Sequence, residues 1–117
     1  MNILEKLFGP PVPAVSPAEA QAKLKTRPAP FLLDVRQPEE YRDAHIAGAA
    51  LIPLNELGQR LAELPKEREI LCVCRSGNRS HAAAQQLLRA GYQAVDLRGG
   101  MLAWQSARLP VKTGMAR

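Results

Sequence analysis

The chain has 117 residues, a length that fits one domain with a substantial hydrophobic core. Hydrophobic residues make up 46% and charged residues 23% of the sequence, which argues against a largely disordered chain. The net charge of +5 could attract nucleic acid, but the basic residues are scattered and form no basic–aromatic stripe, so we expect no nucleic-acid partner.

The sequence carries no sign of export or membrane insertion. No apolar run approaches the roughly 20 residues that span a bilayer, and the N-terminus lacks the three regions of a signal peptide. Cys72 and Cys74, two positions apart in one predicted strand, are poorly placed for a strain-free disulfide, so we expect reduced thiols. These observations predict a cytoplasmic protein with no membrane span.

The first half of the chain predicts helices that alternate with short strands. Apolar residues on one face of residues 1–8, before Gly9-Pro10-Pro11, predict a short amphipathic segment. Ser16-Pro17-Ala18-Glu19 is typical of a capped helix start, which predicts a helix to about Lys25 after a short strand that ends at Val15. The next predicted elements are a buried strand over 31–35, a short helix over 38–42 and a strand over 49–52.

The second half repeats this alternation. Its predicted elements are an amphipathic helix over 54–64, a strand over 70–73, a helix over 80–90, a strand over 94–97 and a helix over 101–107. Such a pattern indicates an α/β fold, a central mostly parallel five-stranded sheet with helices on both faces. We expect residues 1–13 to be an N-terminal segment and linker, 14–112 the domain, and 113–117 a C-terminal tail.

The segment from Cys74 to Ser80 reads as a nucleophile loop between a strand and a helix. Ligands of parallel sheets lie beyond the carboxyl ends of the strands, where Cys74 falls. Backbone N–H groups in a short loop that enters a helix stabilise anions, and such surroundings favour the thiolate form of cysteine. The sequence therefore predicts Cys74 as a reactive nucleophile rather than a buried structural thiol.

Further motifs accompany this loop along the chain. They are Asp34-Val35-Arg36 with Glu40-Tyr41, His45-Ile46-Ala47-Gly48-Ala49 with Ile52-Pro53, and Gly99-Gly100 with Trp104. In this order and spacing, residues 15–110 resemble the rhodanese-like sulfurtransferase family. Two departures are Ala44, where the family often has glycine, and Ala47, where it often has proline. Both lie outside the cysteine loop.

The resemblance implies a single rhodanese-like domain in which Cys74 takes a sulfane sulfur from a small anionic donor such as thiosulfate. The resulting persulfide passes its sulfur to a thiol or cyanide, and a protein can serve as donor or acceptor. Attack on a sulfur–sulfur bond needs a thiolate, which agrees with this role. The residues that match the family's substrate-binding loop are Arg75, Ser76, Gly77, Asn78 and Arg79, and Ser80 begins the helix behind them.

Several supporting residues are interpreted as structural. Asp34 and Arg36 are expected to hold loops around the site, and His45 to make hydrogen bonds in a turn. Arg79 either binds the anionic donor or pairs with a carboxylate such as Asp34 or Glu40, and we favour the pairing. Neither histidine has metal-ligand spacing with the cysteines, so we expect no metal and no cofactor.

Three alternatives remain beside this interpretation. Cys72 is expected in the core, with a resolving thiol as the other reading. A cysteine-dependent phosphatase is disfavoured, because that loop has one residue more between its cysteine and arginine than Cys74 and Arg79 have between them. A sulfur-carrier or interaction module, which would receive persulfide sulfur from a partner protein, is the main competitor of the enzyme.

Overall fold

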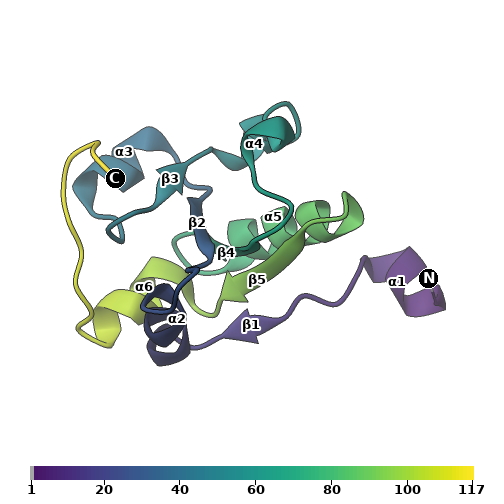
Figure 1. Ribbon diagram of the computed structural model, residues 1–117, viewed down its shortest axis with the longest axis horizontal. Helices are drawn as coiled ribbons and strands as arrows, with labels where there is room; N and C mark the ends of the chain where they lie inside the picture. Colours follow the sequence, from purple (N-terminus) through teal and green to yellow (C-terminus); the bar gives the residue numbers. More distant parts are fainter. Residues whose placement is uncertain (1) are drawn as a thin grey trace.

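The computed structural model describes residues 2–117 and contains a five-stranded sheet in the order β1-β5-β4-β2-β3 (Figure 1). The strands are β1 (Ala14–Val15), β2 (Phe31–Asp34), β3 (Ala50–Leu51), β4 (Glu69–Val73) and β5 (Gln93–Leu97). The helices are α1 (Ile3–Phe8), α2 (Pro17–Leu24), α3 (Pro38–Asp43), α4 (Leu54–Leu57), α5 (Asn78–Arg89) and α6 (Gly100–Ser106), with a 3-10 turn η1 (Leu61–Glu63). All neighbouring strands pair in parallel, so the predicted α/β fold is confirmed.

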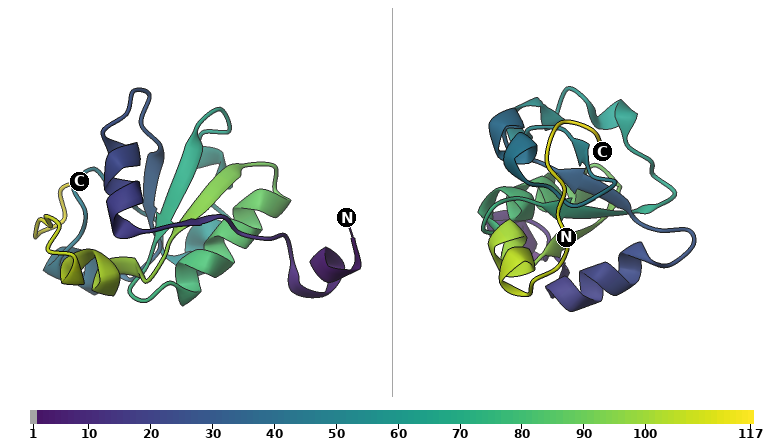
Figure 2. Two further views of the ribbon diagram at one scale, coloured as in Figure 1. Left: turned by 90° about the horizontal axis from the view of Figure 1, so that it is seen from below. Right: turned by 90° about the vertical axis from the view of Figure 1, so that its left-hand side faces the viewer.

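Strand β4 occupies the centre of the sheet, between β5 and β2. Four of its five residues are buried, as expected for a strand covered on both faces. On one face Ile70 and Cys72 lie in a core cluster with Leu87 of α5, and on the other Val73 lies in a cluster with Trp104 of α6. Figure 2 shows helices on both sides of the sheet. Strand β4 is therefore paired with a neighbouring strand on each side and packed against a core cluster on each face.

The start of α2 follows directly from its sequence. The Ser16 Oγ accepts the N–H of Glu19 at 3.2 Å, and a Glu19 carboxylate oxygen accepts the N–H of Ser16 at 2.8 Å. Pro17 occupies the first turn, where its missing N–H has no cost. The capping box expected from the sequence is confirmed.

The single helix expected over 54–64 was wrong. Helix α4 ends at Leu57, and after Gly58 the chain continues into η1. Glycine disfavours the helix interior because it loses more backbone freedom there than any other residue. Helix α5 also begins at Asn78, two positions before the expected start, because Gly77 is its N-cap.

Helix α1 stands apart from the sheet at one end of the molecule (Figures 1 and 2). Within Ile3–Phe8 no residue is buried, and the four apolar side chains are 64–71% exposed. The Gln85 amide donates to the Phe8 carbonyl at 2.8 Å, which attaches the end of α1 to α5. The expected short amphipathic segment is thus a helix. No helix in residues 2–117 is long and apolar enough to cross a membrane.

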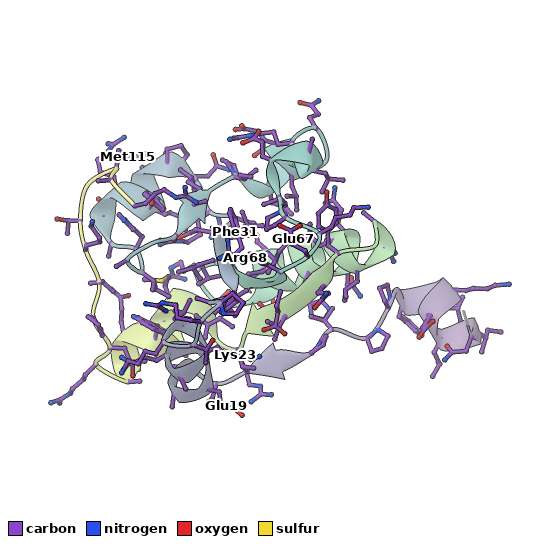
Figure 3. All side chains as sticks on the ribbon, in the orientation of Figure 1. Glu19, Lys23, Phe31, Glu67, Arg68 and Met115 are labelled. Atoms are coloured by element: carbon purple, nitrogen blue, oxygen red, sulfur yellow. The ribbon has the colours of Figure 1, made fainter. Side chains whose placement is uncertain are left out.

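The strands are parallel, so they all begin on one side of the sheet and end on the opposite side. On the side where the strands begin, the guanidinium of Arg68 lies 5.7 Å from the ring centroid of Phe31 (Figure 3). Cys74 follows β4 on the side where the strands end.

Candidate active site

Cys74 is the first residue after β4 and is only 1% exposed. Its Sγ accepts the backbone N–H of Gly77 at 3.0 Å and lies 3.2 Å from the Ser80 Oγ. An N–H aimed at the sulfur stabilises its anionic form. The structure therefore brings together Cys74, Gly77 and Ser80, all three of which the sequence had selected.

Gly77 makes this arrangement sterically accessible. Its φ is +112°, in the region that side-chain-bearing residues rarely adopt, and this turn directs its N–H back toward Cys74. Helix α5 starts at the next residue, so the positive end of its dipole faces the loop. The loop thus supplies both a local donor and a favourable helix end.

The first turn of α6 holds the other side of the loop. The N–H of Met101 donates to the Cys74 carbonyl at 2.8 Å, and the N–H of Leu102 donates to the Arg75 carbonyl at 3.0 Å. A Cβ on Gly100 would collide with both carbonyl oxygens, and Gly100 also has a φ of +57°. The Gly99-Gly100 motif therefore lets α6 approach the cysteine loop closely enough for these bonds.

Arg79 is engaged with Glu40 rather than open to a ligand. Its two terminal nitrogens donate to the two carboxylate oxygens at 2.7 and 2.8 Å, which ties α5 to α3. These bonds lower the pKa of Glu40 to about 2, although partial burial acts in the other direction, and they raise the pKa of Arg79. Of the two roles considered for Arg79, the structure shows the pairing with a carboxylate, which is that of Glu40. Arg75, in contrast, is exposed.

Asp34 and Arg36 form a buried ion pair at the end of β2. The Arg36 Nη2 lies 2.8 Å from the Asp34 Oδ2, and the Nε donates to the Oδ1 at 3.0 Å. Arg36 also donates to the Ala44 carbonyl at 2.7 Å. Because both charges have several partners, the pair fixes the chain after α3 against β2.

His45 is fully buried and holds the C-terminal residues. Its Nδ1 lies 2.9 Å from the Tyr41 carbonyl oxygen and its Nε2 lies 2.7 Å from that of Ala116, while its ring stacks on Tyr41 at 3.7 Å. Both ring nitrogens are thus occupied by backbone oxygens. In this position His45 joins residues 113–117 to the domain.

The remaining residues of the loop face outward. Ser76 and Asn78 are exposed, and Gly77 is partly buried. Cys72 lies in the core, where burial and then the neighbouring Asp96 raise the pKa of its thiol well above the usual range. The sequence reasoning missed Asp96, whose signal is a lone carboxylate inside the apolar strand over 94–97.

A parallel sheet whose central strand ends in a cysteine loop, with an amide directed at the sulfur, defines an α/β protein with its candidate site at a buried cysteine. Residues 16–107 match the family described as the Rhodanese-like domain, and the chain belongs to this family. The resemblance found in the sequence is thereby confirmed.

Three comparisons illustrate the relationship. A sulfurtransferase of Allochromatium vinosum is 38% identical over 82 residues, which cover 69% of this chain and 77% of that protein. Bacillus subtilis YrkF, named as a candidate sulfur carrier, is 37% identical over 94 residues, covering 80% of this chain and 51% of that protein. The crystal structure of a rhodanese-related protein from Thermoplasma volcanium matches with a TM-score of 0.80 at 32% identity, covering 86% of this chain and 97% of that one.

Proposed function

We propose that this protein is a sulfurtransferase that carries a sulfane sulfur as a persulfide on Cys74. The observation that carries the proposal is the 3.0 Å hydrogen bond from the Gly77 N–H to the Cys74 Sγ, at the end of the central strand. A sulfur held there as a thiolate is a nucleophile toward a sulfur–sulfur bond. Membership of the rhodanese-like family supports the same chemistry.

The proposed reaction has two transfers. The Cys74 thiolate attacks the sulfane sulfur of thiosulfate, the sulfur–sulfur bond of thiosulfate breaks, and sulfite leaves with the electron pair. The product is a Cys74 persulfide with its negative charge on the terminal sulfur. Cyanide or a thiolate then attacks that terminal sulfur, the new bond forms, and the Cys74 thiolate leaves and is restored.

Each loop residue receives a role in this proposal. The exposed Arg75 attracts the anionic donor. The backbone amides of Ser76, Gly77 and Asn78 surround the terminal sulfur of the persulfide, since a tight loop before a helix presents several N–H groups to one anion. Arg79 acts through Glu40 to hold the loop in place.

Four residues outside the loop, Ser80, Asp34, Arg36 and His45, hold the loop and its surroundings in position. Ser80 contacts the Cys74 sulfur at 3.2 Å. The buried pair of Asp34 and Arg36 and the stacked ring of His45 fix the chain around α3, from which Glu40 reaches Arg79. Asp34, Arg36 and His45 are assigned no contact with the sulfur donor.

A sulfur-carrier role is the second candidate, because this chain is similar to a protein named as a candidate sulfur carrier. In that case Cys74 would receive sulfur from a partner protein's persulfide and react poorly with thiosulfate. Both roles need a reduced thiol, and both cysteines are free thiols here. We therefore propose a reducing compartment, the cytoplasm, for either role.

Mass spectrometry of the purified protein tests the proposal. After thiosulfate treatment we expect one added sulfur atom on the peptide that contains Cys74, its removal by cyanide, and formation of thiocyanate. Cys74→Ser should remain unmodified, and Cys72→Ala is the matched control that should still be loaded. Loading by a protein persulfide but not by thiosulfate would select the carrier, and no loading by either donor would refute both roles.

A further inference from the structure

Helix α1 presents a continuous apolar face to solvent. Its four apolar side chains, Ile3, Leu4, Leu7 and Phe8, are 64–71% exposed and account for most of the large apolar side chains that residues 2–117 expose. At about 100° per residue, their positions fall within about 140° of the helix circumference. Single exposed apolar residues are ordinary on a protein surface, whereas a contiguous apolar patch marks an interaction site.

The helix is capped at both ends and attached to the domain. The Asn2 Oδ1 accepts the N–H of Glu5 at 2.9 Å, and the N–H of Gly9 donates to the Glu5 carbonyl at 2.8 Å. The amide of Gln85 attaches the end of α1 to α5. Gly9 is buried, and a Cβ there would collide with the Arg89 guanidinium, so the chain packs directly on the last turn of α5. These contacts hold the apolar face of α1 in a fixed direction, apart from the sheet (Figures 1 and 2).

The area of this face is too small for a stable contact with a second copy of the chain. A large side chain has at most about 250 Å² of surface, so four that are 64–71% exposed offer at most roughly 700 Å². A standard stable interface buries roughly 800 Å² on each partner. Each copy also carries a net charge of +5, so two copies repel each other. A dimer through the apolar face of α1 is therefore disfavoured.

The charged groups around the apolar face are mostly basic. Lys6 lies on α1 itself, and Arg89 lies where α1 is attached to α5. The Lys66 Nζ donates to the carbonyl of Ala90, the residue after Arg89, at 3.3 Å. Among residues 2–117, none of these three cations forms an ion pair. Glu5 is the acidic residue of α1. A negatively charged surface therefore complements both this neighbourhood and the net charge of +5.

We propose that α1 docks this protein reversibly on an anionic lipid bilayer. The apolar face of α1 enters the boundary between headgroups and acyl chains, and Lys6, Arg89 and Lys66 lie next to the lipid phosphates. Amphipathic helices bind bilayers in this way, through buried apolar area together with attraction to anionic lipids. Because α1 has only six residues, neither contribution suffices alone, and binding requires both. The cytoplasmic leaflet carries the negative potential that this requires.

Flotation of the full chain with lipid vesicles tests the proposal. The vesicles contain phosphatidylcholine and phosphatidylserine in a ratio of about 3:1, and vesicles of phosphatidylcholine alone are the comparison. We expect the protein to float with the first kind at low salt, and to be released at about 0.5 M salt, where surface charges are screened. Absence of flotation with phosphatidylserine, or equal flotation with both kinds, would overturn the proposal. No sulfur donor is used, so the result is independent of the chemistry proposed for Cys74.

Substitutions separate the two contributions. Phe8→Asp should weaken vesicle binding at least tenfold, because it removes a large apolar side chain from the inserted face. Lys6→Gln should weaken binding about fivefold, the effect of one basic residue near an anionic surface. Met115→Asp is the matched control, since Met115 is 51% exposed and lies far from α1, and it has the same change of charge as Phe8→Asp (Figure 3). Equal losses in Phe8→Asp and Met115→Asp would show that net charge alone is responsible and would contradict the role of α1.

A fluorescent side chain reports insertion directly. In Phe8→Trp we expect the emission of the introduced tryptophan to shift to the blue when phosphatidylserine vesicles are added. The parent protein should show no shift, because Trp104 is only 2% exposed and lies in the core. Flotation of Phe8→Trp without a shift would mean adsorption through charge without insertion, which refutes the proposal.

Sedimentation velocity without vesicles tests the other occupant of this face. We expect a monomer for the parent protein and for Phe8→Asp. A dimer that Phe8→Asp abolishes would assign the face to a second copy of the chain and overturn the proposal. Urea denaturation of Phe8→Asp should match that of the parent, because α1 has no buried residue, so its loss of vesicle binding is not a loss of fold.

Discussion

Replacing Glu40 by glutamine should destabilise the protein in a pH-dependent way. Glutamine keeps the shape of the side chain and loses the charge that Arg79 binds through two hydrogen bonds of 2.7 and 2.8 Å. The pair joins α3 to the helix that follows the cysteine loop. Its loss should therefore weaken the fold near Cys74.

The magnitude follows from the pKa of Glu40, which falls from 4.5 to about 2, chiefly through the hydrogen bonds from Arg79. At about 1.4 kcal/mol per pKa unit this gives an upper limit of about 3 kcal/mol. Both side chains are partly exposed, at 27% and 35%, so solvent screening reduces the expected value to about 1–2 kcal/mol. Because the folded-state pKa is the lower one, this stabilisation is present above about pH 4.5 and disappears as the pH falls through about 2.

Urea denaturation measures this effect directly. The free energy of unfolding of Glu40→Gln should lie about 1–2 kcal/mol below that of the parent protein at pH 7, and the difference should shrink between pH 4.5 and about 3. Glu39→Gln, an exposed neighbour on the same helix, is the matched control and should change little. A difference that is equal at all pH values would show that packing, not charge, is responsible, and no difference at pH 7 would refute the reasoning.

Three further results are expected. Gly100→Ala should destabilise the protein and slow sulfur loading at least tenfold, because the added Cβ would collide with the loop carbonyls. Gly114→Ala is the control, because Gly114 also has a positive φ, +90°, but no atom lies within 4 Å of the added Cβ. In urea denaturation this control should show only the cost of the backbone strain, about 1–2 kcal/mol. Asp34→Ala should lower the free energy of unfolding by about 3–5 kcal/mol, since it leaves a buried guanidinium unpaired. Circular dichroism and mass spectrometry of Cys74→Ser should show an intact fold without sulfur loading, while Cys72→Ala should load normally.

Much of the fold could be predicted because its signals are local. The capping box of Ser16 and Glu19 lies within four consecutive residues, and the apolar strands are short apolar runs, two of which are flanked by proline or glycine. The same holds for the loop after Cys74, whose glycine and following helix are adjacent in sequence. The break at Gly58 was missed because the amphipathic pattern continues across it.

The parts that could not be predicted depend on strand order. The contact of α6 with the cysteine loop and the approach of Asp96 to Cys72 both require β5 to lie beside β4, which no local pattern specifies. The sequence likewise did not decide whether Arg79 pairs with Asp34 or with Glu40. The structure resolves it, because Arg36 already occupies Asp34 and leaves Glu40 for Arg79.

The two cysteines show how position along one strand separates a core residue from a nucleophile. Both point to the same face of the sheet and both are nearly inaccessible to solvent. Cys72 lies within the strand, where the backbone N–H groups around it serve the sheet, and burial disfavours its thiolate. Cys74 lies one residue beyond the end of β4, where the chain turns at Gly77 and an N–H becomes available to the sulfur. The end of the hydrogen-bond ladder, more than exposure, therefore decides which sulfur has a backbone N–H to accept from.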